Sequence, residues 1–204
     1  MRTLLLALSL LSLSACTIGV NLPETDKSST CGQHCIANVE VLVDPTKSTK
    51  EEIEQSALQG YEINFYQAVA NVTRTELLNS KYSVADGNAL TVGRSDFPHY
   101  AIAYHIEHKE LSIPSTVFGE SHAKAEIVYE LFDSSKQLLL TQRETCSFSD
   151  EMSSGETTSH LLMPFDSLFA VSFTEFLGRV WITTVEDCSH RFIEKVNVIA
   201  NNAH

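Results

Sequence analysis

The chain has 204 residues, of which 43% are hydrophobic, and this is enough for one ordinary domain with a sizeable core. Its formal net charge is −12 at pH 7, from 26 acidic and 14 basic residues. So acidic a balance argues against binding to nucleic acid and against lying flat on anionic lipid, because both partners are themselves negatively charged.

The first residues have the pattern of a secretion signal. Arg2 is followed by a run of Leu, Ala and Ser from Leu4 to Leu13. A short positive region followed by a short apolar region is typical of such signals, whereas a membrane-spanning helix needs about 20 apolar residues. A buried helix is the less favoured alternative, because the run has no polar face. We therefore expect residues 1–15 to be a signal peptide.

The signal ends in Leu13-Ser14-Ala15-Cys16, which resembles the lipobox of bacterial lipoproteins. The resemblance implies that the Cys16 thiol receives a diacylglycerol, that the preceding peptide is removed and that the new amino group is acylated. Two or three acyl chains make such an attachment stable. Thr17 stands where the inner-membrane retention signal of these lipoproteins has Asp, which implies the periplasmic face of the outer membrane of a Gram-negative bacterium.

The segment after Cys16 is predicted to be a tether. Residues 16–33 contain few apolar side chains and several Ser, Thr, Pro and Gly, so we expect a lipid anchor followed by a flexible linker. Residues 34–204 are then predicted to be a single periplasmic domain, because no internal repeat or second boundary is visible.

Four cysteines remain if Cys16 is acylated: Cys31, Cys35, Cys146 and Cys188. An even number in an oxidising compartment favours two disulfides, and four thiols allow three connectivities. We favour Cys31–Cys35 with Cys146–Cys188, since the second pair lies at element ends that could meet. A redox or metal role for the first pair is less favoured, because its spacing is one residue longer than Cys-x-x-Cys and no nearby pair completes a zinc set.

The first half of the domain is predicted to be a strand, a long helix and a short strand. Alternation and β-branched residues predict a strand over 36–43. Two overlapping capping boxes, Ser48 with Glu51 and Thr49 with Glu52, predict a helix start. The acidic residues there suit the positive end of the helix dipole. Apolar residues then recur at helical spacing to about Leu78: Ile53, Ala57, Tyr61, Phe65, Ala68, Val69 and Val72. A short strand is predicted over 81–86, followed by a polar loop over 86–97.

The middle of the chain predicts three alternating strands. The run 99–111 places Tyr100, Ile102, Tyr104 and Ile106 on one face, and the run 123–132 points Ala125, Ile127, Tyr129 and Leu131 inward. Residues 133–136 are predicted to form a turn, and 137–148 returns as the partner strand of a hairpin.

The last part of the chain is predicted to be helical. After a polar segment over 149–159, Pro164 is expected near the start of a long helix. Its apolar stripe is typical of core packing and contains Phe165, Leu168, Phe169, Ser172, Phe176, Leu177, Val180, Trp181 and Thr184. A second, short helix is predicted around 193–199. The resulting fold class is α+β, a mostly antiparallel sheet with two long helices packed on one face.

Histidines are the only candidate catalytic or metal-binding residues present in number. We expect His105 and Glu107 to share one face of their strand and His108 and Glu110 the opposite face. This makes His105 and His108 weak candidates for a metal site, although His and Glu in alternation are more typical of the solvated face of a sheet. No Gly-x-Ser-x-Gly elbow and no glycine-rich phosphate loop occurs. We therefore expect no catalytic residues, no cofactor apart from the covalent lipid and no enzymatic activity, with a metal-dependent hydrolase as the less favoured alternative.

The order of these segments resembles the small envelope lipoproteins of the YajG and ABC-transport-auxiliary type. The segments that carry the resemblance are the lipobox, the tether, the strand IANVEVLV, the helix and strand from 51 to 84, the hairpin AEIVYELFDSSKQLLLTQRETCSF and the helix PFDSLFAVSFTEFLGRVWITTV. The resemblance implies a non-enzymatic accessory module that docks on a protein partner of the envelope machinery. The alternative is a binder or carrier of a small apolar ligand such as lipid, held between helices and sheet.

Overall fold

The computed structural model describes residues 16–19, 35–47, 50–56, 59–86, 98–112, 119–151 and 168–202. Within them the strands are β1 (Cys16–Gly19), β2 (Asn38–Val41), β3 (Glu51–Ser56), β4 (Gln59–Ile63), β5 (Ser83–Asp86), β6 (His99–Leu111), β7 (Glu120–Asp133) and β8 (Leu138–Glu151), and the helices are α1 (Phe65–Asn79) and α3 (Leu168–Asn202). The predicted loops over 86–97 and 149–159 lie largely outside the described residues.

The main sheet has five strands in the order β5-β2-β6-β7-β8. The pairs β6–β7 and β7–β8 are antiparallel, whereas β2 is parallel to both β5 and β6. Because β2 and β5 are parallel neighbours, the chain between them must cross back along the sheet, and α1 lies on this crossover. The α+β class is therefore confirmed, but the sheet is mixed. The packing of both helices on a single face stays a prediction.

The predicted helix over 51–78 is wrong in its first part. Residues 51–56 and 59–63 form the antiparallel pair β3–β4, which belongs to a small sheet of order β1-β4-β3. Helix α1 begins only at Phe65, where the side chain of Asn64 accepts a hydrogen bond of 2.9 Å from the Gln67 amide and caps the helix. Ile53 and Tyr61 are register partners in the β3–β4 pair, so their spacing of eight residues fits a hairpin as well as a helix.

Helix α3 is one continuous helix of 35 residues, so the break predicted before 193 is wrong. The polar residues His190 and Arg191, which directly precede the predicted short helix, lie on the exposed side of α3. Val185, Cys188 and Phe192 continue the buried side. Polar residues on one side therefore interrupt the sequence pattern without interrupting the apolar stripe.

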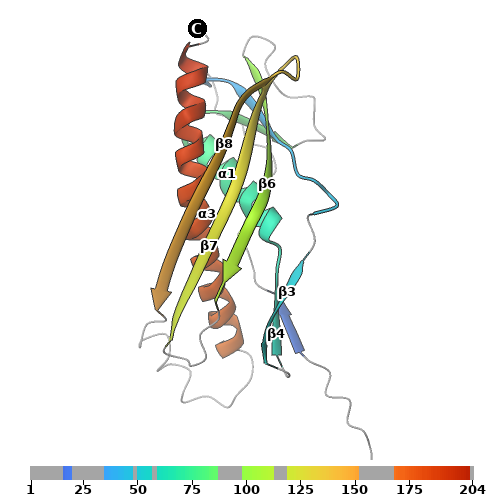
Figure 1. Ribbon diagram of the computed structural model, residues 1–204, viewed down its shortest axis with the longest axis vertical. Coiled ribbons are helices and arrows are strands. Elements are labelled where there is room, and N and C mark those ends of the chain that lie inside the picture. Colours follow the sequence, from blue (N-terminus) through green and yellow to red (C-terminus); the bar gives the residue numbers. More distant parts are fainter. Residues whose placement is uncertain are drawn as a thin grey trace, which may run out of the picture.

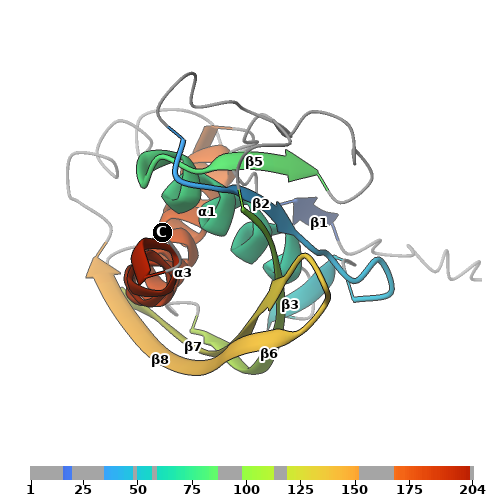
Figure 2. The same cartoon turned by 90° about the horizontal axis from the view of Figure 1, so that it is seen from above.

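The core lies between the helices and the strands. Figure 2 shows β6, β7 and β8 as a curved wall with α3 inside the curve, and α3 contacts β7, β8 and α1. The ring of Tyr129 stacks on that of Phe192 with centroids 4.5 Å apart, and Phe65 meets Trp181 edge to face at 4.6 Å. The inward residues predicted on the middle strands are buried, with Ile106 partly buried: Tyr100, Ile102, Tyr104, Ala125, Ile127, Tyr129 and Leu131.

Candidate functional site

The predicted lipidation residue, Cys16, is the first residue of strand β1. This strand runs parallel to β4 and pairs Cys16 with Gln59 and Gly19 with Glu62. The first four residues of the predicted anchor and tether segment 16–33 therefore form a strand, and residues 20–34 lie outside the described residues. Thr17 and Ile18 are β-branched, and such residues favour a strand. This local indication was missed because the segment was interpreted from its overall composition.

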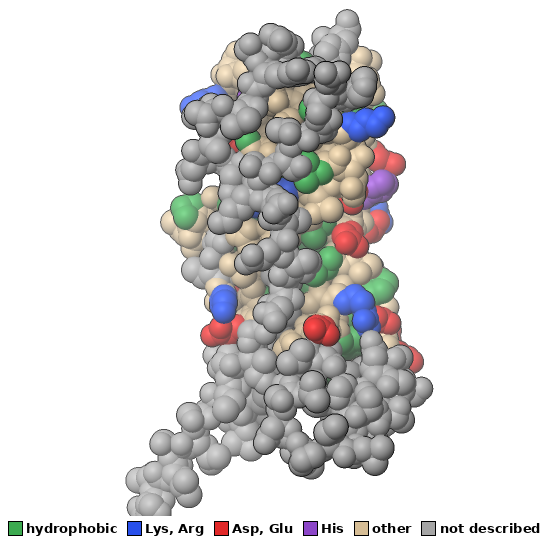
Figure 3. All heavy atoms as spheres, turned by 180° about the vertical axis from the view of Figure 1, so that it is seen from behind, with side chains coloured by type: hydrophobic (Ala, Val, Ile, Leu, Met, Phe, Trp, Pro, Cys, Tyr) green, Lys and Arg blue, Asp and Glu red, His purple; other side chains and the backbone are tan. Residues whose placement is uncertain are grey.

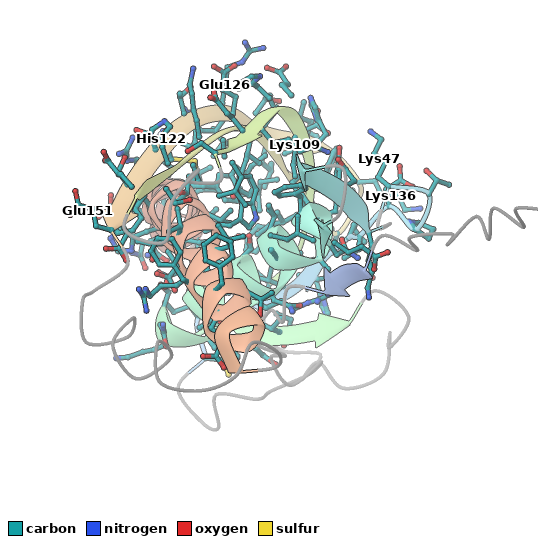
Figure 4. The ribbon with its side chains drawn as sticks, turned by 90° about the horizontal axis from the view of Figure 1, so that it is seen from below. Lys47, Lys109, His122, Glu126, Lys136 and Glu151 are labelled. Atoms are coloured by element: carbon teal, nitrogen blue, oxygen red, sulfur yellow. A yellow bond between two sulfur atoms is a disulfide. The ribbon has the colours of Figure 1, made fainter. Side chains whose placement is uncertain are left out.

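The small sheet that contains β1 is joined to the main body by Lys109 of β6. The Lys109 ammonium forms an ion pair with Glu51 of β3 and lies 5.2 Å from the ring centroid of Phe65 and 5.7 Å from that of Tyr66 (Figure 4). An ammonium group over aromatic faces is attracted by the ring electrons. One side chain thus connects β6, β3 and the first turn of α1.

A β-bulge at Glu107 gives Lys109 this position. Ile106 pairs with Ile127 and His108 with Glu126, so Glu107 is the extra residue on β6. An extra residue reverses the alternation beyond it. Lys109 therefore lies opposite the buried Ala125 and not on the solvated face. No feature of the sequence indicated the bulge.

The same bulge corrects the prediction for the two histidines. His105 pairs with Val128 and His108 with Glu126, and these partners are two residues apart on β7. Both histidines therefore belong to the same face of the sheet, where Figure 4 places Glu126 on the outer side. Their side chains are 42% and 49% exposed.

Each of these histidines lies near a glutamate of its own strand. His105 Nε2 lies 3.7 Å from Glu107 Oε1, and His108 Nε2 lies 3.8 Å from Glu110 Oε2. Glu107 also accepts a hydrogen bond of 2.8 Å from Arg143 of β8. Among the described residues, no group of three or more His, Cys, Asp or Glu side chains could hold a metal ion. His34, His160 and His204 lie outside them.

The predicted disulfide Cys146–Cys188 is confirmed and joins β8 to α3, with the two Cα atoms 5.7 Å apart. About two helical turns further along α3, Lys195 Nζ donates a hydrogen bond of 2.6 Å to the buried Glu144 of β8. Cys35 is also disulfide-bonded, while its predicted pairing with Cys31 falls outside the described residues.

Buried hydroxyl groups link the two helices to the main sheet. Ser189 of α3 lies 3.1 Å from the Tyr129 hydroxyl and 3.2 Å from that of Thr73 on α1. The Tyr104 hydroxyl donates a hydrogen bond of 2.8 Å to the Tyr66 carbonyl. Burial raises the pKa of Tyr104 and of Tyr129 well above the usual range, so both stay neutral near pH 7. Their hydroxyls serve packing and hydrogen bonding.

The described charged side chains alternate in sign over the visible surface. On the face seen in Figure 3, acidic and basic groups stand next to one another along the molecule and do not gather by sign. Ion pairs of this kind include Arg179 of α3 with Asp150 of β8, 3.1 Å apart. Neither described helix is long and apolar enough to cross a membrane.

No known family model matches the chain, and no curated protein sequence matches it. Among solved structures, it is similar to protein XCC0632 of Xanthomonas campestris, from the family DUF330, at 10% identity and a TM-score of 0.48, over 92% of this chain and 98% of the other. It is also similar to a minor lipoprotein of Acinetobacter baumannii at 7% identity and a TM-score of 0.42, over 82% and 93% of the two chains.

Proposed function

We propose that this protein is a bacterial envelope lipoprotein, acylated on Cys16 and held at the periplasmic face of the outer membrane. The observation that carries the proposal is the motif Leu13-Ser14-Ala15-Cys16 behind a short apolar signal. The confirmed disulfide Cys146–Cys188 supports it, because such bonds persist in oxidising compartments outside the cytosol.

The role that we propose is that of a non-enzymatic accessory module for envelope machinery. The candidate metal ligands His105 and His108 lie on the exposed face of β6, each beside one glutamate. Such an arrangement is typical of a solvated sheet face. A partner protein bound near the membrane would gain from the anchor, because attachment raises the local concentration of the module even when its affinity is weak.

The alternative of a carrier for a small apolar ligand has less support. Such a ligand would need space between α3 and the strands, where the stacked rings of Tyr129 and Phe192 already lie. Phe65 and Trp181 fill the neighbouring region in the same way. Native mass spectrometry of the purified full chain would favour the carrier if lipid is released from it in stoichiometric amount.

Lipidation is tested by expressing the full chain in a Gram-negative host with radiolabelled palmitate. We expect label in the wild-type protein, a mature form that begins at Cys16, and recovery in the outer-membrane fraction. The Cys16→Ala variant should take up no label. The matched control is Cys146→Ala, which removes a different cysteine and should still take up the label. An unlabelled wild-type chain that still begins at Met1 would refute the proposal.

The accessory role is tested by crosslinking in living cells, followed by identification of captured proteins. We expect one envelope protein to be captured reproducibly by the wild-type chain and at a much lower yield by a Cys16→Ala form exported without an anchor. Equal capture and an equal cellular phenotype for both forms would show that the anchor has no part in the function.

A further inference from the structure

We propose that the end of the molecule formed by β1, β3 and β4 is a membrane-facing surface, held against the lipid headgroups without an intervening tether. The inference rests on the proposed acylation of Cys16 and adds to it the orientation of the domain. Its basis is the pairing of Cys16 with Gln59, which makes the proposed anchor residue part of a sheet.

No flexible linker separates the proposed anchor residue from the first strand in this arrangement. A lipoprotein with a flexible linker can turn freely, because many residues separate the acylated cysteine from the first strand. Here β1 starts at Cys16 itself, and neighbouring strands lie about 4.8 Å apart. The acyl-bearing residue is therefore one strand spacing from Gln59 of β4.

The strand direction places Cys16 at the outer end of the small sheet. Strand β4 runs from Gln59 to Ile63 and is followed, after Asn64, by α1 at Phe65. Since β1 is parallel to β4 and Cys16 pairs with the first residue of β4, Cys16 lies at the end of the sheet remote from α1. An acyl chain would therefore leave the domain at this end.

The small sheet is coupled to the body, so the orientation of one determines that of the other. Only Asn64 separates β4 from α1, and its side chain caps that helix. The Lys109–Glu51 ion pair joins β3 to β6, and β1 contacts α3. With three such connections, the small sheet cannot turn independently of the main sheet.

The far end of the molecule then projects away from the bilayer. Figure 1 shows β3 and β4 near one end of the long axis and the β7–β8 turn at the opposite end. A helix of 35 residues such as α3 is about 52 Å long, at about 1.5 Å per residue. The turn at 134–137 should therefore stand tens of ångströms further from the lipid than the small sheet does.

Charge on the small sheet disfavours insertion of this sheet into the hydrocarbon core beyond the headgroups. At the end of the small sheet next to α1, Lys50, which directly precedes β3, forms an ion pair of 3.5 Å with Glu62 of β4, and the Lys50 side chain is 62% exposed. Charged side chains at an interface stay in water. The net charge of −12 makes a zwitterionic bilayer the suitable probe, because an anionic one would repel the whole domain.

Resonance energy transfer measures this orientation. The full acylated chain is placed in zwitterionic phosphatidylcholine nanodiscs that carry acceptor dye on the lipid headgroups. A donor dye is attached through an unnatural amino acid either at Lys50, near the small sheet, or at Lys136, in the β7–β8 turn. We expect transfer from position 50 to be several times more efficient than transfer from position 136.

A linker variant is the matched control. Insertion of about 20 Gly and Ser residues between Cys16 and Thr17 adds a flexible span of about 25 Å, so the difference between the two positions should largely disappear. Equal transfer from both positions without the linker, or an unchanged difference with it, would overturn the inference.

Intact-mass measurement separates this result from the proposed function. If Cys16 carries its acyl groups and both positions give equal transfer, only the orientation is refuted and the lipoprotein assignment stands. If Cys16 carries no acyl group, both proposals fail together.

Discussion

Lys109 of β6 and Glu51 of β3 form an ion pair that joins the two sheets of the protein. The two side chains are 29% and 37% exposed, so solvent screens the pair only in part. The contact requires the bulge at Glu107, because strict alternation along β6 would direct Lys109 to the solvated face. A local irregularity thus determines how the small sheet is attached.

Replacement of Lys109 by Ala should loosen the small sheet. The loss of a screened ion pair and of contacts with two rings should lower the free energy of unfolding by about 1–2 kcal/mol. It should also speed hydrogen exchange in β3 and β4 more than in β7 and β8. Urea unfolding and exchange mass spectrometry measure the two effects. The exposed Lys47 provides the control variant Lys47→Ala. Equal exchange profiles for the two variants would contradict the coupling.

The Cys146–Cys188 disulfide should be a major stabilising bond. It closes a loop with a sequence separation of 42, for which the chain-entropy model gives about 4 kcal/mol. The double variant Cys146→Ala, Cys188→Ala should therefore unfold at a markedly lower urea concentration. Reductant should destabilise the wild type more than this variant, since only the wild type can lose the bond. Identical midpoints for the two proteins would refute the prediction.

The segments that sequence reasoning predicted well are those whose pattern has one interpretation. In β7, Ala125, Ile127, Tyr129 and Leu131 alternate strictly and are buried. The turn between β7 and β8 follows Asp133, the last residue of β7, whose carboxylate accepts hydrogen bonds from the amides of Ser135 and Gln137. These features are local, so neighbouring residues are sufficient to specify them.

The errors arose where distant contacts decide between two local possibilities. The spacing of Ile53 and Tyr61 suits a helix and a hairpin equally, and pairing of β4 with β1 favours the hairpin. Gly60 is a poor helix residue and was the local indication against the helix. The bulge at Glu107 left no sequence signal, because its effect depends on the register with β7.

Alkaline pH should destabilise the protein through Tyr82. Burial raises the pKa of this phenol from 10.0 to about 12, and its hydroxyl donates a hydrogen bond of 2.7 Å to Asn197 of α3. The pKa of this phenol is higher in the folded state than in the unfolded state. Its contribution to the free energy of unfolding is therefore complete below pH 10.0, where the phenol is neutral in both states. That contribution is lost as the pH rises from 10.0 towards 12.

Urea unfolding between pH 7 and pH 11 tests this dependence. Tyr82→Phe removes the titrating group and the hydrogen bond to Asn197, so it should be less stable than the wild type at pH 7 and should lose less stability above pH 10.0. Tyr104 and Tyr129 add to the loss in both proteins, because burial raises the pKa of each phenol in the same direction. Parallel pH profiles for wild type and variant would contradict the assignment to Tyr82.

Replacement of Lys81 by Gly should stabilise the end of α1. Lys81 has a φ of 67°, and the amides of Lys81 and Tyr82 donate to the carbonyls of Leu78 and Leu77, each at 3.0 Å. This is the Schellman motif, whose left-handed position prefers glycine because a Cβ atom is strained there. We expect Lys81→Gly to raise the free energy of unfolding by about 0.5–1 kcal/mol in urea titrations.

A second lysine in the same conformation makes this prediction specific. Lys136, in the β7–β8 turn, has a φ of 64°, so Lys136→Gly should also be stabilising. Lys47→Gly changes an exposed lysine with negative φ and should be neutral or destabilising, because glycine adds freedom to the unfolded chain without relieving strain. Removal of any lysine makes a chain of net charge −12 more negative, so the loss of charge itself is not expected to stabilise the protein. If Lys47→Gly nevertheless stabilises the protein as much as Lys81→Gly does, relief of backbone strain is excluded as the cause.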